Sequence, residues 1–486
     1  MRTEHDALGE MQLPDDAYYG IQALRAANNF DVTNLAFDDF PAIVKAVAEV
    51  KKACAMTNKA IGVLDEAKAN AIMQACDDIL ADKMKGQFPV NIWRGGGTSI
   101  NMNVNEVVAN RANEILTGKK GYDAVHPNTH VNMCQSSNDV YPTAEHIVLY
   151  REIGEVLAAA EVFEQALADK AREFADVVRI GRTGLQDAVP MTMGQVFVGF
   201  RGLVRRNRKL LEQYRDGYRS VVIGGTITGT GLGIMPGYFE RIHEDLSAVT
   251  GIKLHAPEPH DKVELIPDEG LIDAMQNSDG FMILTAYLRG LACAGGKIAN
   301  DLRLLSSGPR AGFGEIVLPA VAPGSSIMPG KINPFMCDLM VQVMHQVSGN
   351  DWGGVMNAVD GNLDLGPNLT VALFGALQSM EMLKNSFRLF SEHCIKGIKV
   401  NAETCKSYAE KSTSLATMVS ALYGYEIGSR IAKLAFAEDI TCKEAALREN
   451  LIPKEAAEEL FDVATLADRK KSVALFAKYS ALRNVK

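Results

Sequence analysis

The 486-residue sequence contains no long apolar segment free of charge and no block of basic residues. Its most apolar stretch, FMILTAYLRGLACAGG, is interrupted by Arg289, so it does not predict a membrane span. The formal net charge is -9, and the densest basic segment, RGLVRRNR at 201–208, has the helical spacing of a solvated or inter-helix face. These absences argue against a membrane and against a nucleic-acid partner.

Cysteine patterns and metal motifs are also absent. The eight cysteines form no CxxC pair, so we expect free buried thiols in a reducing compartment. His126 and His130 are four residues apart, but the intervening Pro127 and Asn128 argue against a helical pair, and there is no HExxH. The first residues, MRTEHDALGE, lack the apolar region of a signal peptide. We therefore expect a cytoplasmic protein with no metal and no cofactor.

Helical periodicity dominates the sequence, and the predicted helices are longer in the middle of the chain than on either side. Five long helices carry more apolar surface than one small domain can bury, which favours an elongated bundle whose outer faces are covered by other subunits. The long helices are predicted at about 143–178, 190–218, 268–306, 334–358 and 366–398. We predict an all-α chain in three parts: an N-terminal domain at 1–142, a central helix-bundle domain at 143–398 and a small C-terminal domain at 399–486.

Shorter helices are expected on both sides of the bundle. One apolar stripe ends near Gly62, and Asp65 is placed to begin the next helix. Residues 87–142 are rich in Asn, Gly, Ser and Pro and contain one clear helix, at about 103–117. In the C-terminal part, Thr441-x-x-Glu444 is a capping box, and Pro453 suits a first helical turn.

Four loops between the helices carry an unusual density of small hydrogen-bond donors. Glycine allows backbone N–H groups to approach a ligand closely, and Ser, Thr and Asn add side-chain donors. Together with Lys331 they would form a neutral-to-positive cage that suits a small anion, especially a carboxylate. The loops are GGGTSINMN (95–103), HPNTHVNMCQSSND (126–139), GRTGLQDAVP (181–190) and GSSIMPGKINP (324–334).

The last of these loops resembles the signature G-S-x-x-M-x-x-K-x-N of the aspartase/fumarase superfamily. Two segments, LPDDAYYGIQALRAANNF at 13–30 and the stretch from NDLRLLSSGPRAG to KINP at 300–334, look closest to its aspartate ammonia-lyase branch. The resemblance implies the all-α three-domain fold of that family, in a homotetramer with a central bundle of twenty helices. It also implies active sites where three subunits meet, and a lyase that releases ammonia from L-aspartate to leave fumarate.

Residue roles follow from motif position in the same resemblance. Ser325 matches the catalytic base, which removes the proton next to one carboxylate and leaves an aci-carboxylate. Lys331 and Asn333 match residues that hold a substrate carboxylate, and Lys331 would also stabilise the developing charge. His130 and Ser326 are further possible site residues. The residues that would grip the dicarboxylate are Thr98, Ser99, Ser136, Ser137, Asn138 and Thr183.

Two positions depart from the family pattern at the leaving-group end. Gly184 stands where the family has His or Gln, and Asp338 stands where it has Glu. Three hypotheses remain open: an aspartase, a sibling lyase acting on another 2-substituted succinate, or a non-catalytic structural protein on the same scaffold. The sibling lyase would release a bulkier amine or hydrate fumarate as a fumarase does. The sequence does not identify the general acid.

Overall fold

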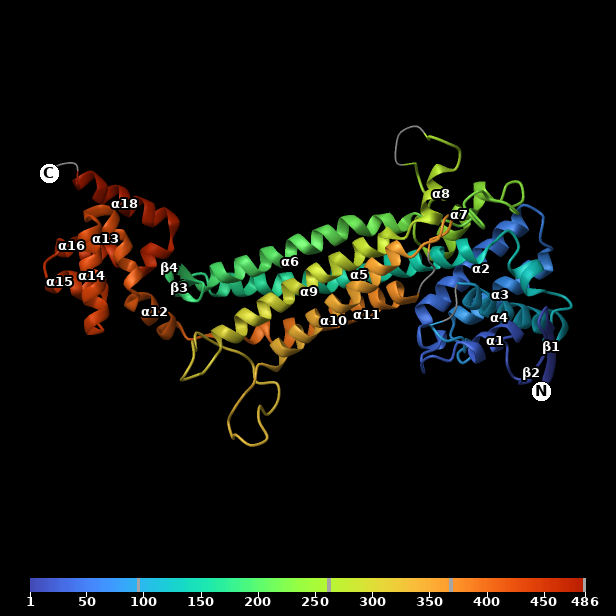
Figure 1. Cartoon of the computed structure of the whole chain (residues 1–486), viewed down its shortest axis with the longest axis horizontal. Helices are drawn as coiled ribbons and strands as arrows, with labels where there is room; N and C mark the ends of the chain where they lie inside the picture. Colours follow the sequence, from blue (N-terminus) through green and yellow to red (C-terminus); the bar gives the residue numbers. More distant parts are fainter. Residues whose placement is uncertain (94–96, 260–263, 367–369, 484–486) are drawn as a thin grey trace. The chain divides into compact units, whose positions relative to one another are not determined.

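The computed structural model describes residues 1–93, 97–259, 264–366 and 370–483, and these residues are mostly helical (Figure 1). The chain divides into two compact units. Unit 1 consists of Met1–Leu157, Lys209–Gly290 and His345–Leu383, and unit 2 of Ala158–Arg208, Leu291–Met344 and Lys384–Lys486. The division into three domains predicted from the sequence stays a prediction.

Five long helices contribute residues to both units, and each was predicted from periodicity. They are α5 (Ser137–Glu173), α6 (Met193–Arg215), α9 (Asp279–Leu305), α10 (Phe335–Val359) and α11 (Thr370–His393). The predicted helix at 268–306 is wrong in one respect, because it is broken into α8 (Glu269–Gln276) and α9. Asn277 takes an extended backbone there and its Nδ2 donates to the Asp273 carbonyl oxygen (3.3 Å), so a cap-favouring residue ends α8.

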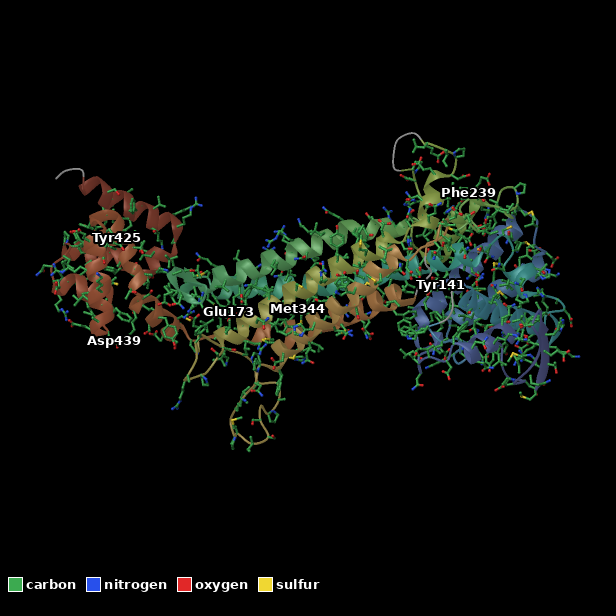
Figure 2. All side chains as sticks on the ribbon, in the orientation of Figure 1. Tyr141, Glu173, Phe239, Met344, Tyr425 and Asp439 are labelled. Carbon is green, nitrogen blue, oxygen red and sulfur yellow. The ribbon has the colours of Figure 1, made fainter. Side chains whose placement is uncertain are left out.

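The N-terminal part of unit 1 is built on three packed helices. Helix α2 packs on α3, which packs on α4, and α7 lies against α2. Asp65 begins α3 as predicted, and its side chain accepts from the Lys68 N–H. Tyr141 of α5 is fully buried, and Phe239 begins α7 (Figure 2). The elements are β1 (Arg2–Asp6), β2 (Gly9–Leu13), α1 (Ile21–Asn29), α2 (Pro41–Ala60), α3 (Glu66–Leu80), α4 (Thr98–Thr117) and α7 (Phe239–Thr250).

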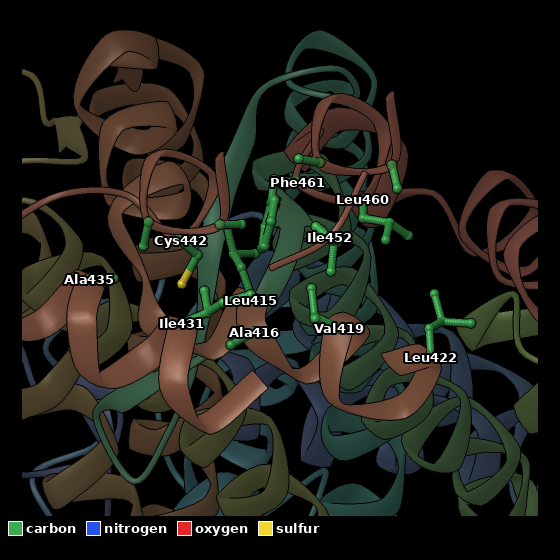
Figure 3. Close-up of a cluster of buried hydrophobic side chains, with 14 of the residues drawn as sticks. Leu415, Ala416, Val419, Leu422, Ile431, Ala435, Cys442, Ile452, Leu460 and Phe461 are labelled. Carbon is green, nitrogen blue, oxygen red and sulfur yellow. The ribbon is translucent and has the colours of Figure 1, made fainter. Parts of the chain in front are cut away.

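The C-terminal part of unit 2 has its own apolar core. Buried side chains from the seven helices α12 to α18 and from β3 meet there, including Val419, Ile431 and Leu460 (Figure 3). The Thr441 capping box is confirmed, while Pro453 immediately precedes its helix rather than lying in the first turn. The helices are α12 (Ala402–Lys411), α13 (Ala416–Tyr423), α14 (Tyr425–Glu438), α15 (Cys442–Arg448), α16 (Lys454–Leu460), α17 (Val463–Ala467) and α18 (Arg469–Arg483).

Three short antiparallel strand pairs complete the described structure. They are β1 with β2, β3 (Val178–Thr183) with β4 (Gln186–Thr192), and β5 (Ile316–Val317) with β6 (Lys399–Val400). Among the described residues, no helix is both long enough and apolar enough to cross a membrane. All eight cysteines are free thiols, and seven of them are buried.

Candidate active site

The first polar loop leads directly into a helix. Helix α4 begins at Thr98, so Thr98 and Ser99 occupy its first turn, and the helix predicted at about 103–117 starts five residues too late. Thr98 is exposed and Ser99 is half-buried. The first N–H groups of a helix have no intrahelical partner, and together with the helix dipole they favour an anion. Gly95 and Gly96 of this loop lie outside the described residues.

The second polar loop also ends in a helix start. Helix α5 begins at Ser137, six residues before the predicted Thr143, and Pro142 lies inside it. The Ser136 hydroxyl accepts from the Asn138 N–H (3.2 Å), while the Asp139 carboxylate accepts from the Ser136 N–H (2.9 Å). This reciprocal pattern of a capping box fixes the first turn, and Pro142, near the helix start, removes only one backbone donor.

Hydrogen bonds join the starts of α4 and α5 within unit 1. The Nδ2 of Asn101 in α4 donates to the Ser137 hydroxyl (2.9 Å) and to Asn132 Oδ1 (3.1 Å). The Asn138 side chain in turn donates to the Ile227 carbonyl oxygen (3.0 Å). Asn101 therefore links the starts of the two helices that carry five predicted residues, and we name these residues the grip cluster: Thr98, Ser99, Ser136, Ser137 and Asn138.

A buried carboxyl group supports the grip cluster from behind. Asp139 is fully buried and also accepts from the N–H groups of Gly224 (3.1 Å) and Thr226 (3.0 Å). Burial raises the pKa of Asp139 to about 7, although the backbone donors favour its charged form. The glycine-rich segment at 224–233, which carried no functional prediction, is thereby held against the start of α5.

His130 lies in a single helical turn, Pro127–Val131, which begins at the proline, while His126 precedes that turn with an extended backbone. Its Nδ1 accepts from the His126 N–H (2.9 Å), and its Nε2 lies 3.2 Å from Lys68 Nζ. The pKa of His130 is lowered, mainly because its imidazole is partly buried. Within the described ranges, no group of three or more His, Cys, Asp or Glu side chains is arranged to hold a metal ion.

The third polar loop is not a loop but a β-hairpin in unit 2, which the sequence reasoning missed. Thr183 ends β3 and pairs with Gln186, so Gly184 and Leu185 form a two-residue turn. Both have left-handed backbones, with φ of +55° and +63°. This combination is typical of a type I′ turn, which matches the strand twist. Nothing lies within 4 Å of the position a Gly184 Cβ would take.

A buried ion-pair group anchors this hairpin. Glu315 is fully buried and accepts from Arg179 Nε (2.9 Å) and Arg182 Nη1 (2.6 Å), one on each oxygen. The Arg182 guanidinium also lies over the ring of Phe313 (4.4 Å). The turn that carries Gly184 is thus tied to the chain segment that leads into the fourth loop.

The fourth loop, which we name the signature loop (324–334), is exposed and lies between α9 and α10 (Figure 1). The Ser325 hydroxyl oxygen accepts from two backbone N–H groups, those of Ile327 (3.3 Å) and Met328 (3.0 Å). Ser326 and Lys331 are exposed. The Lys331 N–H donates to the Met328 carbonyl oxygen (3.3 Å), but its ammonium group makes no hydrogen bond or ion pair with any residue the structure describes. Two backbone donors on the Ser325 oxygen are what a serine alkoxide would need.

The neck of the signature loop is closed by close backbone contact. The Asn333 side chain donates to the Gly324 carbonyl oxygen (2.5 Å). A Cβ at Gly324 would collide with the Lys331 carbonyl oxygen and would lie 2.7 Å from the Asn333 nitrogen. Gly324 therefore allows two backbone segments to approach closely, and it does not act as a flexible hinge. One side-chain N–H of Asn333 is already bonded within the loop.

Asp338 lies in the first turn of α10, and its carboxylate faces Arg303 Nε at 3.4 Å. Both side chains are partly exposed, so the pair contributes little to stability. Asp338 therefore has a basic partner within unit 2, which the sequence reasoning did not predict.

The sequence reasoning also missed a buried lysine beside the grip cluster. Lys51 of α2 is fully buried and donates to Asn132 Oδ1 (2.9 Å) and Gln135 Oε1 (2.7 Å). The available signal was its spacing, because Lys51 follows Val47 by four residues and precedes Cys54 by three, on the apolar stripe itself.

Known proteins share both the sequence and the fold of this chain. The family described as Lyase matches residues 9–349, and the family described as Fumarase C C-terminus matches residues 415–468. The aspartate ammonia-lyase of Bacillus subtilis is 42% identical over 457 residues, which cover 93% of each chain. The class II fumarate hydratase of Neisseria meningitidis is 40% identical over 469 residues, which cover 94% of this chain and 97% of the relative.

A solved structure agrees with these relatives. The crystal structure of "fumarate lyase:delta crystallin" from Brucella melitensis superposes with a TM-score of 0.90 at 43% identity, over 96% of this chain and 99% of that one. The matched families and the fold define a lyase class built on long helices. The chain belongs to the aspartase/fumarase superfamily, and its all-α fold is that of the family. Because the relatives divide between ammonia-lyases and hydratases, they leave the substrate undecided.

Proposed function

We propose that this lyase eliminates ammonia from L-aspartate to give fumarate, with Ser325 as the base. The observation that carries the proposal is the environment of the Ser325 hydroxyl, whose oxygen faces two backbone N–H groups in an exposed loop. Each N–H would stabilise negative charge on that oxygen and so lower the pKa of the hydroxyl. The alkoxide formed in this way could act as the base, whereas a neutral serine hydroxyl is a very weak base.

The proton on the carbon next to a carboxylate is a poor acid, because its loss places two negative charges on that carboxylate. The reaction therefore needs fixed donors on one side and a base on the other. In the proposed site, Lys331 and one side-chain N–H of Asn333 would hold one carboxylate. The other side-chain N–H of Asn333 donates to the Gly324 carbonyl oxygen. The grip cluster and Thr183 would hold the other end of the substrate.

We further propose that the active enzyme is a cytoplasmic homotetramer, in which each active site takes residues from three subunits. Exposed apolar side chains on the long helices support this assembly, among them Val198 of α6 and Trp352 and Val359 of α10. Sedimentation tests the assembly, and a fully active monomer would contradict it.

One observation favours a second candidate substrate, an aspartate carrying a larger group on nitrogen. The space beside Gly184 is open, whereas a His or Gln there would occupy the leaving-group end. The turn gives Gly184 a separate explanation, because its left-handed backbone suits glycine. We rank the aspartase reaction first, because it is the reaction of the branch that the signature segments resemble most.

The experiment is a substrate panel. Purified protein is given L-aspartate, L-malate and several N-substituted aspartates, and fumarate formation is followed by its ultraviolet absorbance. The proposal expects L-aspartate to have the highest kcat/KM. Preference for L-malate or for a larger amine would assign the sibling reaction instead, and no fumarate from any of them would reject the lyase site.

A further inference from the structure

We propose that Lys51 is a positioning residue that orients the hydrogen-bond donors of the grip cluster toward a substrate carboxylate. The inference rests on the proposed function, because it names how one half of that site is held. Lys51 has no atom at the surface, so it would act only through the side chains around it.

The first step is the ammonium group itself. Lys51 has no carboxylate within ion-pair distance among the residues described, and its hydrogen-bond acceptors are two neutral amide oxygens, on Asn132 and Gln135. A buried ammonium without an ion-pair partner costs free energy. Burial accordingly lowers the pKa of Lys51 to about 8. The carboxyl group of Asp139 is near enough to favour this charge when it is ionised, whereas Cys54 and Cys76 are neutral thiols.

The second step is the orientation of the two amides. Asn132 Nδ2 donates to the Gln135 carbonyl oxygen (3.1 Å), so its Oδ1 must face Lys51. Gln135 Nε2 donates to the carbonyl oxygens of Val131 (3.0 Å) and Met133 (3.1 Å), which turns its Oε1 the same way. Each amide therefore has only one satisfactory orientation, and the ammonium completes it.

The third step reaches the grip cluster. Asn132 Oδ1 also accepts from the side-chain nitrogens of Asn101 and Asn105, both at 3.1 Å. Asn101 Nδ2 donates in addition to the Ser137 hydroxyl oxygen (2.9 Å). With its oxygen already accepting, the Ser137 hydroxyl has its own hydrogen available for an external acceptor.

The result is a chain of hydrogen bonds that links a buried cation through two amides to a serine hydroxyl. Lys51 and Asn101 donate to the same oxygen, Asn132 Oδ1, so the ammonium fixes the position of this acceptor and thereby holds the amide that donates to Ser137. A free carboxylate is the acceptor that suits the end of this chain, because the chain offers donors and positive charge. We infer that Lys51 contributes substrate affinity rather than fold stability.

The test uses succinate, a dicarboxylate without a leaving group, in calorimetric titrations of the full-length protein. Lys51→Met keeps the length and apolar stem of the side chain and removes its charge and donors. We expect about tenfold weaker succinate binding, which corresponds to one hydrogen bond to a charged group. The melting temperature should stay at or above that of the wild type, because a costly buried charge has been removed.

The matched control is Lys170→Met in unit 2. Lys170 is also buried, and its ammonium donates to the Glu173 carboxylate (2.8 Å) and the Ile398 carbonyl oxygen (2.9 Å). Its replacement should leave succinate affinity within about twofold of the wild type, a difference below one hydrogen bond. A loss in this control equal to that in Lys51→Met would overturn the proposal.

A double-mutant cycle separates positioning from mere support of the fold. Ser137→Ala should weaken succinate binding in the wild type but much less in Lys51→Met, because residues in one network are coupled. Additive losses, or unchanged affinity in Lys51→Met, would overturn the proposal. Should Lys51→Met fail to fold, Asn101→Ala breaks the same chain at its last amide, and the same weak binding and the same coupling with Ser137→Ala are expected.

The proposed function can fail separately from this inference. Wild-type protein that neither binds succinate nor releases fumarate from the substrate panel would reject the lyase site itself. Wild-type protein that binds succinate while Lys51→Met binds it equally well would reject only the role of Lys51.

Discussion

The grip cluster and the signature loop both display small polar side chains, but the protein holds them in different ways. The grip cluster lies on the first turns of α4 and α5, and its members are tied to buried groups such as Asn101 and Asp139. The signature loop is exposed, its tip residue Ile327 is 82% exposed, and its side-chain hydrogen bonds stay within the loop. Rigid helices suit substrate binding, whereas a weakly held loop can close over the substrate at little cost.

The comparison teaches that glycine has the same use in the two regions, which is to let neighbouring groups approach closely. Gly324 allows the neck of the signature loop to close, because a side chain there would collide with backbone atoms. In the segment that supports the grip cluster, a Cβ at Gly224 would lie 2.7 Å from the ring of Phe239. Both glycines are needed for close approach, so neither of them supports the proposal that the signature loop moves over the substrate.

The largest expected effect concerns the base. Ser325→Ala should lower kcat by about 10²–10⁴, the usual loss on removing a general base. The matched control is Ile327→Ala, which removes an exposed side chain from the same loop but keeps the backbone N–H that faces Ser325. Steady-state kinetics on both variants checks the claim. Activity of Ser325→Ala close to that of Ile327→Ala would place the base elsewhere.

The second effect tests whether the hairpin near the signature loop is as firmly held as the grip cluster. Glu315→Ala leaves Arg179 and Arg182 buried without a carboxylate, which should cost about 3–5 kcal/mol in the free energy of unfolding. Glu315→Gln, which keeps one acceptor and the side-chain volume, should cost less. Urea unfolding measures both, and equal stability of Glu315→Ala and the wild type would show that the hairpin is held by other contacts.

A third, smaller effect should appear in the pH dependence of stability. The pKa of Asp139 is about 7 in the folded protein and about 4 when unfolded, so folding favours its protonated form. Its contribution to stability is therefore lost as pH rises from about 4 to about 7. Asp139→Asn cannot titrate, so its unfolding free energy should improve relative to the wild type across that window. A difference that is constant with pH would show that burial does not dominate at Asp139.

The smallest effect is expected at the leaving-group end. Gly184→His, alone and with Asp338→Glu, rebuilds the usual family pair, and Gly184→Asn is the control because Asn tolerates a left-handed backbone. The left-handed conformation should cost Gly184→His about 1–2 kcal/mol of stability. If the open space is functional, kcat/KM for N-substituted aspartates should fall in the double variant while that for L-aspartate holds or rises. Equal changes on every substrate would mean that Gly184 serves only the turn.

Much of the helical framework could be predicted from the sequence, because periodicity reports which faces are buried. The five long helices and the helix that begins after Asp65 are examples. Helix starts were the weak point. Thr98 and Ser137 carry loop-like residue types, yet both are helical. The hydrogen bonds between Ser136 and the first turn support the start of α5, whereas no side chain caps α4.

The rest of the site depends on contacts that a linear sequence does not show. The hairpin at Thr183 was missed because Leu185 takes a left-handed backbone, which its residue type does not predict. Glu315 and Arg182 are 133 residues apart, and nothing in their spacing links them. The signature motif identified Ser325 and Lys331, but the N–H groups facing Ser325 became visible only with the loop conformation.

The grip cluster is proposed to bind the substrate, and Ser325 is proposed to remove its proton. One pair of titrations tests this separation of roles most directly. Succinate is titrated calorimetrically into Ser325→Ala and into Ser137→Ala, each as full-length protein. The account predicts that Ser325→Ala binds succinate as the wild type does, within about twofold, while Ser137→Ala binds about tenfold more weakly. If Ser325→Ala lost succinate affinity as severely as Ser137→Ala, Ser325 would bind the dicarboxylate rather than act only as the base, and the separation of its role from that of the grip cluster would be wrong.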